Sequence, residues 1–260
     1  MSTFYFKGIT LLITHYNRSN SLERLLKSFK DQGYQFEDIV VSDDGSKTEH
    51  VAYLKALQND YSFNLVTAPV NKGLGNNINK GQEAVKTPYT LYVQEDFIPK
   101  SQFMDKLKFS YSFLEENSEF DMIRYYAYFK YPSLKPYKNG FSEMVFNWWS
   151  ILGTYRKFYY YSDHPHLRRS NFLLKFGRYA EGVKGDVTEY RMMMSFLKNK
   201  GRALFFEDFK GLFDQVNSAE EPSTMKRNFW RENGSWAISA LRHFYRHVRF
   251  NFDLHFSSNQ

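Results

Sequence analysis

ITLLITHYNR, residues 9–18, is the stretch that decides the fold of this chain. Its first six residues are apolar or β-branched, which is typical of a strand buried on both faces. A helix is predicted directly afterwards, because leucines and a phenylalanine recur at helical spacing from Leu22 to Phe29. Asn20 followed by Glu23 resembles a capping box, so we expect this helix to begin near Asn20. A buried strand that leads straight into a helix is the opening unit of an α/β sheet.

The same order of strand and helix repeats as far as residue 96. Further strands are predicted over residues 39–42, 63–67 and 89–93, and helices over residues 48–59 and from residue 74 to the Thr87-Pro88 stop. The alternation predicts a Rossmann-like, mostly parallel sheet flanked by helices. Ligands of such sheets bind beyond the carboxyl ends of the strands. Polar clusters follow the predicted strands at those ends.

Composition restricts the class of protein. The chain has 260 residues, 42% of them hydrophobic, which suffices for one large α/β domain or for one domain with a C-terminal appendage. It has no cysteine, so disulfides, thiolate metal sites and cysteine nucleophiles are excluded and a cytoplasmic location is expected. We find no signal peptide at the start and no apolar run long enough to span a membrane. The formal net charge of +7 favours an anionic partner, whether nucleotide, nucleic acid or membrane surface.

Four segments of the first hundred residues carry a family resemblance. They are ITLLITHYNR (9–18), DIVVSDDGS (38–46), NKGLGNNINKG (71–81) and TLYVQEDF (90–97). In this order they resemble the nucleotide-binding half of family 2 glycosyltransferases, which have the GT-A fold. The resemblance implies an inverting enzyme that moves a sugar from a nucleoside-diphosphate sugar, most often UDP-linked. It also implies a sugar hydroxyl of a glycan or lipid-linked acceptor, in surface polysaccharide or capsule synthesis.

The resemblance also suggests how the chain is divided. We expect residues 1–100 to be the nucleotide-sugar-binding half of a domain whose acceptor-binding and catalytic half is residues 101–220. In that second half, helices are predicted over residues 101–117 and 188–200, and a strand over residues 203–206. Residues 221–260 are interpreted as a basic amphipathic helical extension, with the helix over residues 229–250.

The second segment supplies candidates for recognition of the base. A carboxylate at a strand end, Asp43 or Asp44, can accept a hydrogen bond from uracil N3 or from a ribose hydroxyl. The resemblance places base recognition here, and we favour Asp43 over Asp44. Gly45 permits the tight turn between them and Ser46. The alternative is an ordinary Asp-Asp-Gly-Ser turn without a ligand.

Segments one and three supply further nucleotide contacts. Thr14, Tyr16 and Arg18 leave the first strand where the nucleotide would lie, with Tyr16 packing on the base and Arg18 reaching a phosphate. Gly73 precedes a helix N-terminus, which attracts anions. The resemblance gives Lys80 a place facing the phosphates. The alternatives are that Arg18 is a solvated arginine at the start of the helix and that Lys80 is a surface lysine.

The fourth segment bears on the metal. The resemblance equates Gln94-Glu95-Asp96 with an Asp-x-Asp motif that holds a divalent cation on the diphosphate, so Asp96 becomes the metal ligand and Glu95 either turns toward the ribose or supplies charge. A histidine that often completes the metal shell is matched by Gln215. Magnesium or manganese is the implied cofactor. Because two amides replace two ligands, a weakly bound metal or metal independence is the alternative hypothesis.

An inverting transferase needs a general base opposite the leaving group. The resemblance places an acidic residue at the start of the helix that ends near Gly201, and Glu189 is preferred over Asp186. The alternatives are a helix cap for Asp186 and dipole stabilisation in the first turn for Glu189.

Trp148 and Trp149 stand where the family builds the wall for the acceptor or the donor sugar. The alternative is that these two residues pack in the core.

The C-terminal segment mixes aromatic residues with arginines, as interfacial helices do. It predicts peripheral contact with the inner membrane surface, the alternative being a terminal helix docked on the core.

Two other functions compete with glycosyl transfer: nucleotidyl transfer and binding of nucleic acid without catalysis. A nucleotidylyltransferase would carry a glycine-rich basic loop after the first strand, and residues 15–18 are not one. No recognised nucleic-acid motif is present, so we expect no nucleic-acid partner. The sequence predicts no oligomeric state.

Overall fold

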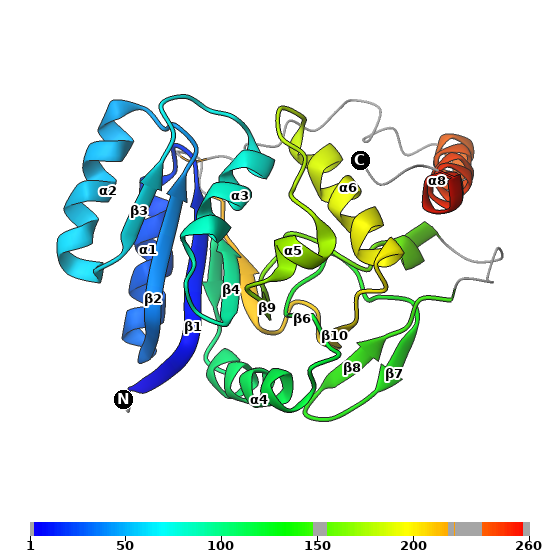
Figure 1. The fold of residues 1–260 in the computed structure, drawn as a ribbon, viewed down its shortest axis with the longest axis horizontal. Helices are drawn as coiled ribbons and strands as arrows, with labels where there is room; N and C mark the ends of the chain where they lie inside the picture. Colours follow the sequence, from blue (N-terminus) through cyan, green and yellow to red (C-terminus); the bar gives the residue numbers. More distant parts are fainter. Residues whose placement is uncertain (1–2, 148–154, 218–220, 222–235, 257–260) are drawn as a thin grey trace.

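The structure is a computed structural model that describes residues 3–147, 155–217, 221 and 236–256. Its centre is a nine-stranded sheet in the order β3-β2-β1-β4-β9-β6-β10-β8-β7 (Figure 1). The nucleotide-binding half expected from the sequence supplies its first four strands. These are β1 (Phe4–His15), β2 (Tyr34–Asp43), β3 (Asn64–Thr67) and β4 (Tyr89–Gln94). All pairings among these four strands are parallel, as the sequence predicts.

Both faces of β1 are buried from Gly8 onward, which explains the unbroken run of apolar and β-branched residues over 9–14. Leu11 and Ile13 lie in one core cluster together with the apolar face of α1 (Ser19–Asp31) and that of α4 (Phe103–Glu116). Leu12 points the other way, into a second cluster with Ile78 of α3 (Leu74–Ala84) and several residues of α6 (Gly185–Lys198). The remaining helix of this half, α2 (Thr48–Tyr61), packs beside α1 and β3.

The second half of the sheet is mixed. β9 (His166–Arg169) runs antiparallel to both β4 and β6 (Met122–Arg124), and so joins the two halves. β10 (Ala203–Phe206) is parallel to β6, whereas β8 (Phe141–Met144) and β7 (Leu134–Pro136) continue antiparallel. One sheet therefore runs through both halves of the expected domain.

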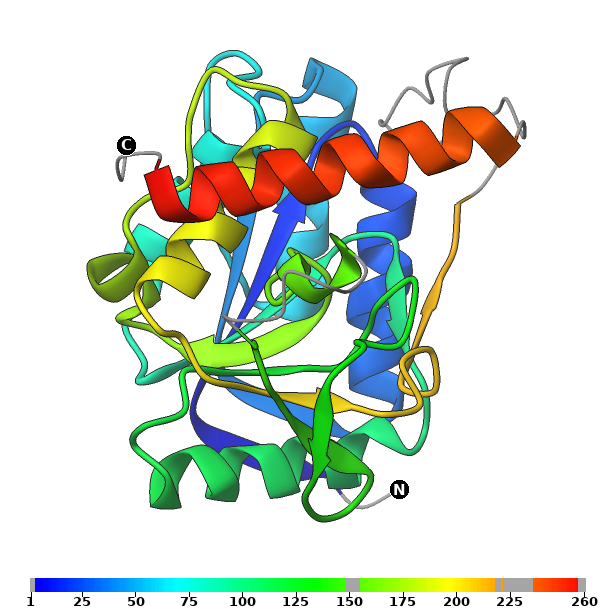
Figure 2. The same ribbon diagram turned by 90° about the vertical axis from the view of Figure 1, so that its right-hand side faces the viewer.

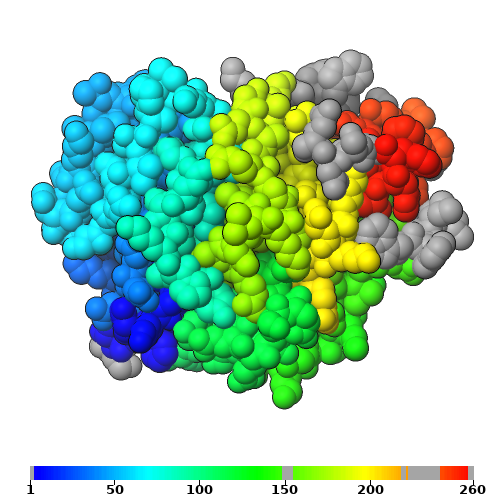
Figure 3. Space-filling model, viewed as in Figure 1, coloured from blue at the N-terminus to red at the C-terminus, as the bar shows by residue number. Residues whose placement is uncertain are grey.

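Two smaller features position the site. β5 (Phe97–Pro99) pairs with β11 (Phe213–Gln215) in a two-stranded sheet that sets Gln215 opposite Phe97. α8 (Trp236–Phe256) lies on the outer side of the molecule, where it contacts α6 and the short helix η1 (Tyr155–Phe158) (Figures 2 and 3). A further short helix, α5 (Phe172–Phe176), packs against α6.

The predicted capping box at Asn20 is wrong. α1 begins at Ser19, and the preceding Arg18 makes no side-chain capping bond. The carboxylate of Glu221, 200 residues away, accepts hydrogen bonds from the backbone N–H groups of Asn20 at 3.0 Å and Ser21 at 2.9 Å. It satisfies donors that a helix N-terminus leaves unpaired and complements the helix dipole. A distant acid therefore caps this helix in place of a local one.

Candidate active site

The polar clusters of the first half meet along one edge of the sheet. The carboxyl ends of β1, β2 and β4 are in register, with His15 opposite Asp43 and Thr14 opposite Gln94. The parallel direction of these strands brings together segments that are up to 80 residues apart in the sequence. The site can therefore be followed strand by strand along this edge.

His15 and Asp43 form the first element of the site. The Nδ1 atom of His15 lies 2.8 Å from Oδ1 of Asp43, and the backbone N–H of Arg18 donates to Nε2 of His15 at 3.1 Å. His15 is therefore neutral, with its proton on Nδ1, in agreement with the burial that lowers its pKa. Sequence reasoning missed this histidine. Its place directly after the strand, opposite Asp43, was the available signal.

The two aspartates of the second segment bind different partners. Asp43 is fully buried and also accepts from the backbone and hydroxyl groups of Ser46. Burial alone would raise the pKa of Asp43, but the hydrogen bonds from His15 and Ser46 lower it. Asp44 accepts from the backbone N–H groups of Lys72 and Gly73, both at 2.9 Å. Asp44 thus holds the glycine loop of the third segment against the end of β2.

Glycine is required on both sides of this contact. Gly45 has a φ of +67°, and a Cβ atom there would lie 2.3 Å from the carbonyl carbon of Val70. Gly73, at the start of α3, has a φ of +87°. Left-handed backbone of this kind is strained for other residues. The two glycines allow the loops after β2 and β3 to approach closely.

Two of the predicted nucleotide contacts, Lys80 and Thr14, have partners within the protein. Lys80 is half-buried, and its ammonium donates to the carbonyl oxygens of Asp43 at 2.6 Å and Val66 at 2.9 Å. Thr14 is buried, with its hydroxyl 3.0 Å from that of Tyr92. Tyr16 is half-buried just beyond β1. Lys80 and Thr14 therefore brace the strand ends against which a nucleotide would lie.

Arg18 is the centre of the charged part of the site. Its guanidinium is buried and donates to Oε1 of Glu95 at 3.2 Å and to Oδ1 of Asn217 at 2.7 Å. It lies 3.5 Å from Oδ2 of Asp96 and also donates to the backbone oxygen of Glu221. Burial and the Asp96 carboxylate raise the pKa of Glu95 to about 8, against the opposing effect of Arg18. The guanidinium of Arg18 thus connects the end of β1 to the end of β4 and to the segment that contains Asn217 and Glu221, beside the two buried acids Glu95 and Asp96.

Asp96 and Gln215 lie side by side, as the family resemblance implies. The side-chain amide of Gln215 donates to Oδ2 of Asp96 at 2.9 Å. The other oxygen of Asp96, Oδ1, is buried and has no hydrogen-bond partner. Within the described ranges, no group of three or more histidine, aspartate and glutamate side chains is arranged to hold a metal ion. A cation here would need further ligands from a bound substrate.

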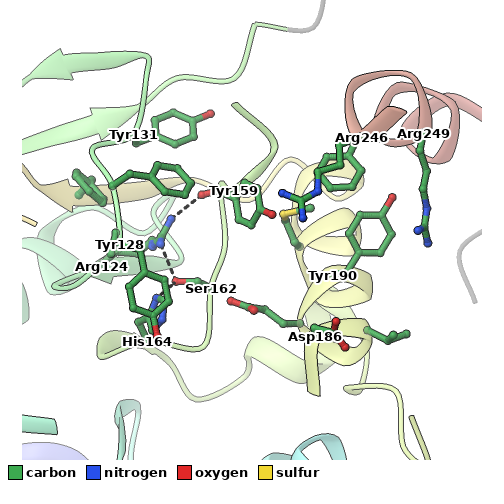
Figure 4. A pocket seen from close by; sticks show the side chains of 17 residues that line it. Arg124, Tyr128, Tyr131, Tyr159, Ser162, His164, Asp186, Tyr190, Arg246 and Arg249 are labelled. Atoms are coloured by element: carbon green, nitrogen blue, oxygen red, sulfur yellow. Dashed lines mark hydrogen bonds between the residues drawn. The ribbon is translucent and has the colours of Figure 1, made fainter. Parts of the chain in front are cut away.

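A cavity of about 510 Å³ lies next to this edge, between the end of β6, the start of α6 and α8 (Figure 4). Aromatic side chains and three arginines make up much of its wall. One of these, Arg124, is buried and donates to the backbone oxygen of Tyr159 at 2.7 Å and to the hydroxyl of Ser162 at 2.6 Å. Burial lowers the pKa of Arg124 to about 10, so it remains charged at neutral pH.

Both candidate bases line this cavity. Glu189 is half-buried, and its Oε1 accepts from the backbone N–H of Asp163 at 3.4 Å. Burial and the carboxyl of Asp163, which also hydrogen-bonds to it, raise the pKa of Glu189 well above its usual value. Asp186 is exposed in the first turn of α6, where Lys184 is the N-cap residue, so Asp186 is not the cap. Glu189 is therefore held against a second acid, Asp163.

Tyr128 joins the strand edge to the cavity. Its hydroxyl donates to Oε1 of Gln215 at 3.2 Å, and its ring lines the cavity and packs edge-on against His164 at 4.6 Å between ring centres. The pKa of Asp163 is raised chiefly by burial and in part by Asp96. Asp96, Gln215 and Tyr128 therefore form a chain of hydrogen bonds from the end of β4 to the wall of the cavity. The predicted wall residues Trp148 and Trp149 lie outside the described residues.

The sheet order defines the class of fold. A half of parallel strands, joined through an antiparallel β9 to a half with a mixed sheet, is the arrangement of the GT-A fold. The chain resembles Staphylococcus aureus TarS residues 1–349 in complex with UDP-GlcNAc, with a TM-score of 0.61 and 17% identity over 96% of this chain and 76% of that one. It also resembles a Pyrobaculum calidifontis mannosyltransferase in complex with GDP-Man and Mn²⁺, with a TM-score of 0.58 and 14% identity over 94% and 64% of the two chains.

The sequence comparisons agree with the fold. The chain belongs to glycosyl transferase family 2, whose family model matches residues 10–181. It is 24% identical over 158 residues to the cholesterol galactosyltransferase of Borreliella burgdorferi, covering 56% of this chain and 43% of that protein. It is 25% identical over 92 residues to the poly-β-1,6-N-acetyl-D-glucosamine synthase of Staphylococcus epidermidis, covering 35% and 22%. The chain thus spans less than half the length of these curated relatives.

Proposed function

We propose that this chain is a glycosyltransferase that inverts the configuration of a sugar as it moves it from a UDP-linked donor to a hydroxyl of a glycan or lipid-linked saccharide. One observation carries the proposal: Tyr128 and Gln215 connect the Arg18–Asp96 cluster to the cavity that contains Glu189. A leaving group and an attacking hydroxyl would then occupy adjoining places. The UDP-GlcNAc bound by TarS and the polymer made by the staphylococcal synthase support a role in surface polysaccharide synthesis.

The donor would lie along the ends of the parallel strands. Tyr16 and the Asp43–Asp44 turn face the nucleoside, and each aspartate retains carboxylate lone pairs for a further donor. The diphosphate would lie near Arg18, whose buried guanidinium supplies positive charge where the departing group gains negative charge. Glu95 and Asp96 would hold Arg18 in this position.

The acceptor would enter the cavity beside Glu189. Its hydroxyl gives a proton to the Glu189 carboxylate while its oxygen attacks the anomeric carbon of the donor sugar. The bond from that carbon to the diphosphate oxygen breaks, and the nucleoside diphosphate leaves with the electron pair. Attack from the side opposite the leaving group inverts the configuration. Aromatic side chains of the cavity, such as Tyr159 and Tyr190, would pack against the sugar ring.

A nucleotide screen tests this function. UDP is expected to raise the unfolding temperature of the protein more than GDP or CMP, since a ligand that binds only the folded state stabilises it. Hydrolysis of a panel of UDP-sugars would then identify the donor. Stabilisation by oligonucleotides and by none of the three nucleotides would contradict glycosyl transfer.

A divalent cation fits this site only together with a substrate. When bound to the diphosphate, such a cation stabilises the charge of the leaving group. The unpartnered Oδ1 of Asp96 would hold it, with the side-chain oxygen of Gln215 nearby. Cations of this kind are often held by one or two carboxylates together with substrate phosphates. Magnesium and manganese are the proposed cofactors.

Mn²⁺ is expected to tighten binding of UDP by about tenfold, which corresponds to ~1.4 kcal/mol. Asp96→Asn should abolish this gain because it replaces the ligating carboxylate. The control is Asp214→Asn, which changes an exposed acid that pairs with Lys100 and should keep the gain in affinity. Calorimetric titration with UDP in Mn²⁺ and in chelator measures the effect. Equal affinities in the two buffers would instead establish that the site works without a metal.

Activity is expected to rise with pH through the pKa of Glu189, because only the carboxylate can accept the proton. That pKa lies well above its usual value owing to burial and to the Asp163 carboxyl. Asp163→Asn removes the neighbouring charge, so the rising limb of the pH–rate profile should move to lower pH. Asp186→Asn, which leaves the pair intact, should not move it. A limb that stays in place in Asp163→Asn would argue against Glu189 as the titrating group.

A further inference from the structure

The outward side of α8 carries a stripe of large apolar side chains, which we call the α8 stripe. Its members share one side of the helix because they recur at intervals of three and four residues. They are between 50% and 75% exposed. They are Leu241, Phe244, Tyr245, Val248, Phe252 and Phe256. Six exposed apolar residues in one continuous row are far more than the scattered ones of an ordinary surface.

The opposite side of α8 holds the helix on the protein. Phe250 and Leu254 are each 6% exposed and belong to the second core cluster. The ring of Phe250 packs against Phe158 of η1 at 5.4 Å and Tyr190 of α6 at 4.9 Å between ring centres. The α8 stripe is therefore distinct from the side of α8 that packs in the core. The helix has two apolar sides, one packed on the domain and one turned to solvent.

Arginines border the stripe along one edge. At 3.6 residues per turn, Arg242 and Arg249 fall between the stripe and the packed side of α8. Arg249 stacks over Tyr190 at 5.2 Å and lies 3.5 Å from Asp253. Asp253 is the one acid in α8, against three arginines. Long cationic side chains beside an apolar row can keep their charge at a polar boundary while their stems cover apolar surface.

We propose that the α8 stripe docks on an anionic lipid surface. The row of aromatic and aliphatic side chains would enter the boundary between headgroups and acyl chains, and the arginine edge would lie among the phosphates. A second copy of the chain fits less well, because it would bring another arginine edge and another net charge of +7 to the contact. α8 lies at the outer edge of the molecule, opposite β3 and α2, so a flat surface can reach it (Figures 1 and 3). No described helix is long and apolar enough to cross a bilayer.

Docking would also orient the cavity. Arg246, Arg249 and Phe250 of α8 line the cavity that contains Glu189. The arginine edge therefore borders both the proposed lipid surface and the cavity, which would bring the cavity to the level of the headgroups. This consequence rests on the proposed function, because it assumes an acceptor that is held at the membrane and reaches Glu189 from the side of α8. The docking itself depends only on α8 and is tested without donor or acceptor.

Vesicle sedimentation tests the docking. The full chain is expected to bind vesicles of phosphatidylglycerol and phosphatidylcholine, and to bind pure phosphatidylcholine at least about tenfold more weakly, with the preference reduced by salt. The double variant Phe244→Glu/Phe252→Glu should lower the partition coefficient on the anionic vesicles by about tenfold or more. The control is Leu174→Glu on α5, which introduces an acid at an apolar residue that is 90% exposed elsewhere and should bind like the natural protein.

Two further measurements show whether the variants fold and whether the α8 stripe instead binds a second copy of the chain. Unchanged unfolding temperatures and UDP affinities would show that the variants fold and keep the nucleotide site. Light scattering on a sizing column should give the same mass for the natural protein and the double variant. A dimer that the double variant converts to monomers would overturn the proposal in favour of a second copy. Absence of vesicle binding by the natural protein, or equal loss in Leu174→Glu, would overturn it outright.

Discussion

Glu189→Gln is expected to lower the rate of sugar transfer by about 10²- to 10⁴-fold, the usual contribution of a positioned general base. The amide keeps the shape of the side chain but cannot take the proton of the acceptor hydroxyl. Affinity for UDP should stay within about twofold, because the donor site is built from the ends of β1, β2 and β4 and not from α6. Transfer assays together with calorimetric titration of UDP separate the two effects.

Asp186→Asn is the matched control. Asp186 lines the same cavity (Figure 4), but it is exposed in the first turn of α6, one turn before Glu189. The structure surrounds Glu189 with a second carboxyl and a buried arginine, and perturbed acids of this kind are typical of catalytic bases. Asp186→Asn is therefore expected to keep most of the activity. Loss in Asp186→Asn with activity kept in Glu189→Gln would exchange the two roles, and activity in both would exclude α6 as the source of the base.

The sequence predicted the parallel half of the fold because its signals are local. A buried apolar strand such as residues 9–14, and a helix bounded by Gly73 and Pro88, can each be recognised within a dozen residues. β9 was missed because its sequence, His166-Leu167-Arg168-Arg169, looks like a surface turn. Arg168 is nevertheless fully buried, since its guanidinium donates to the hydroxyl of Tyr179 and to the side chain of Gln82. A strand made polar by distant partners has no local signature.

The candidate site, too, was predicted only in part from the sequence. Strand ends placed Asp43, Gly73 and Asp96 on one edge because strand direction fixes where the ends meet. Two contacts that organise this edge escaped prediction. The role of His15 depends on its register with Asp43, and that of Glu221 on a contact across 200 residues of sequence. Residue type and spacing identify which groups can act, whereas long-range packing decides which of them are held in place.

Arg18→Ala is expected to weaken binding of UDP by about ten- to a hundredfold, because hydrogen bonds to charged groups contribute ~1.5–3 kcal/mol. The buried guanidinium is the positive group nearest to Glu95 and Asp96 among the contacts of this edge. Without it the two carboxyls face one another in a buried place, where a diphosphate would add further negative charge. The pKa of Glu95, already raised to about 8, should rise further because Arg18 lowers it in the natural protein.

Arg24→Ala is the control for this loss. Arg24 lies on α1, the helix that Arg18 precedes, and donates to the hydroxyl of Ser21 and to the backbone oxygen of Val216 rather than to either acid. Its removal takes away an equal charge a short distance from the site, so a general electrostatic effect would appear in both variants and decline with salt. A specific role for Arg18 requires that only Arg18→Ala loses affinity for UDP while its affinity for uridine, which has no diphosphate, changes little. Equal losses for UDP and uridine would mean that Arg18 acts by holding the strand ends together and not by binding the diphosphate.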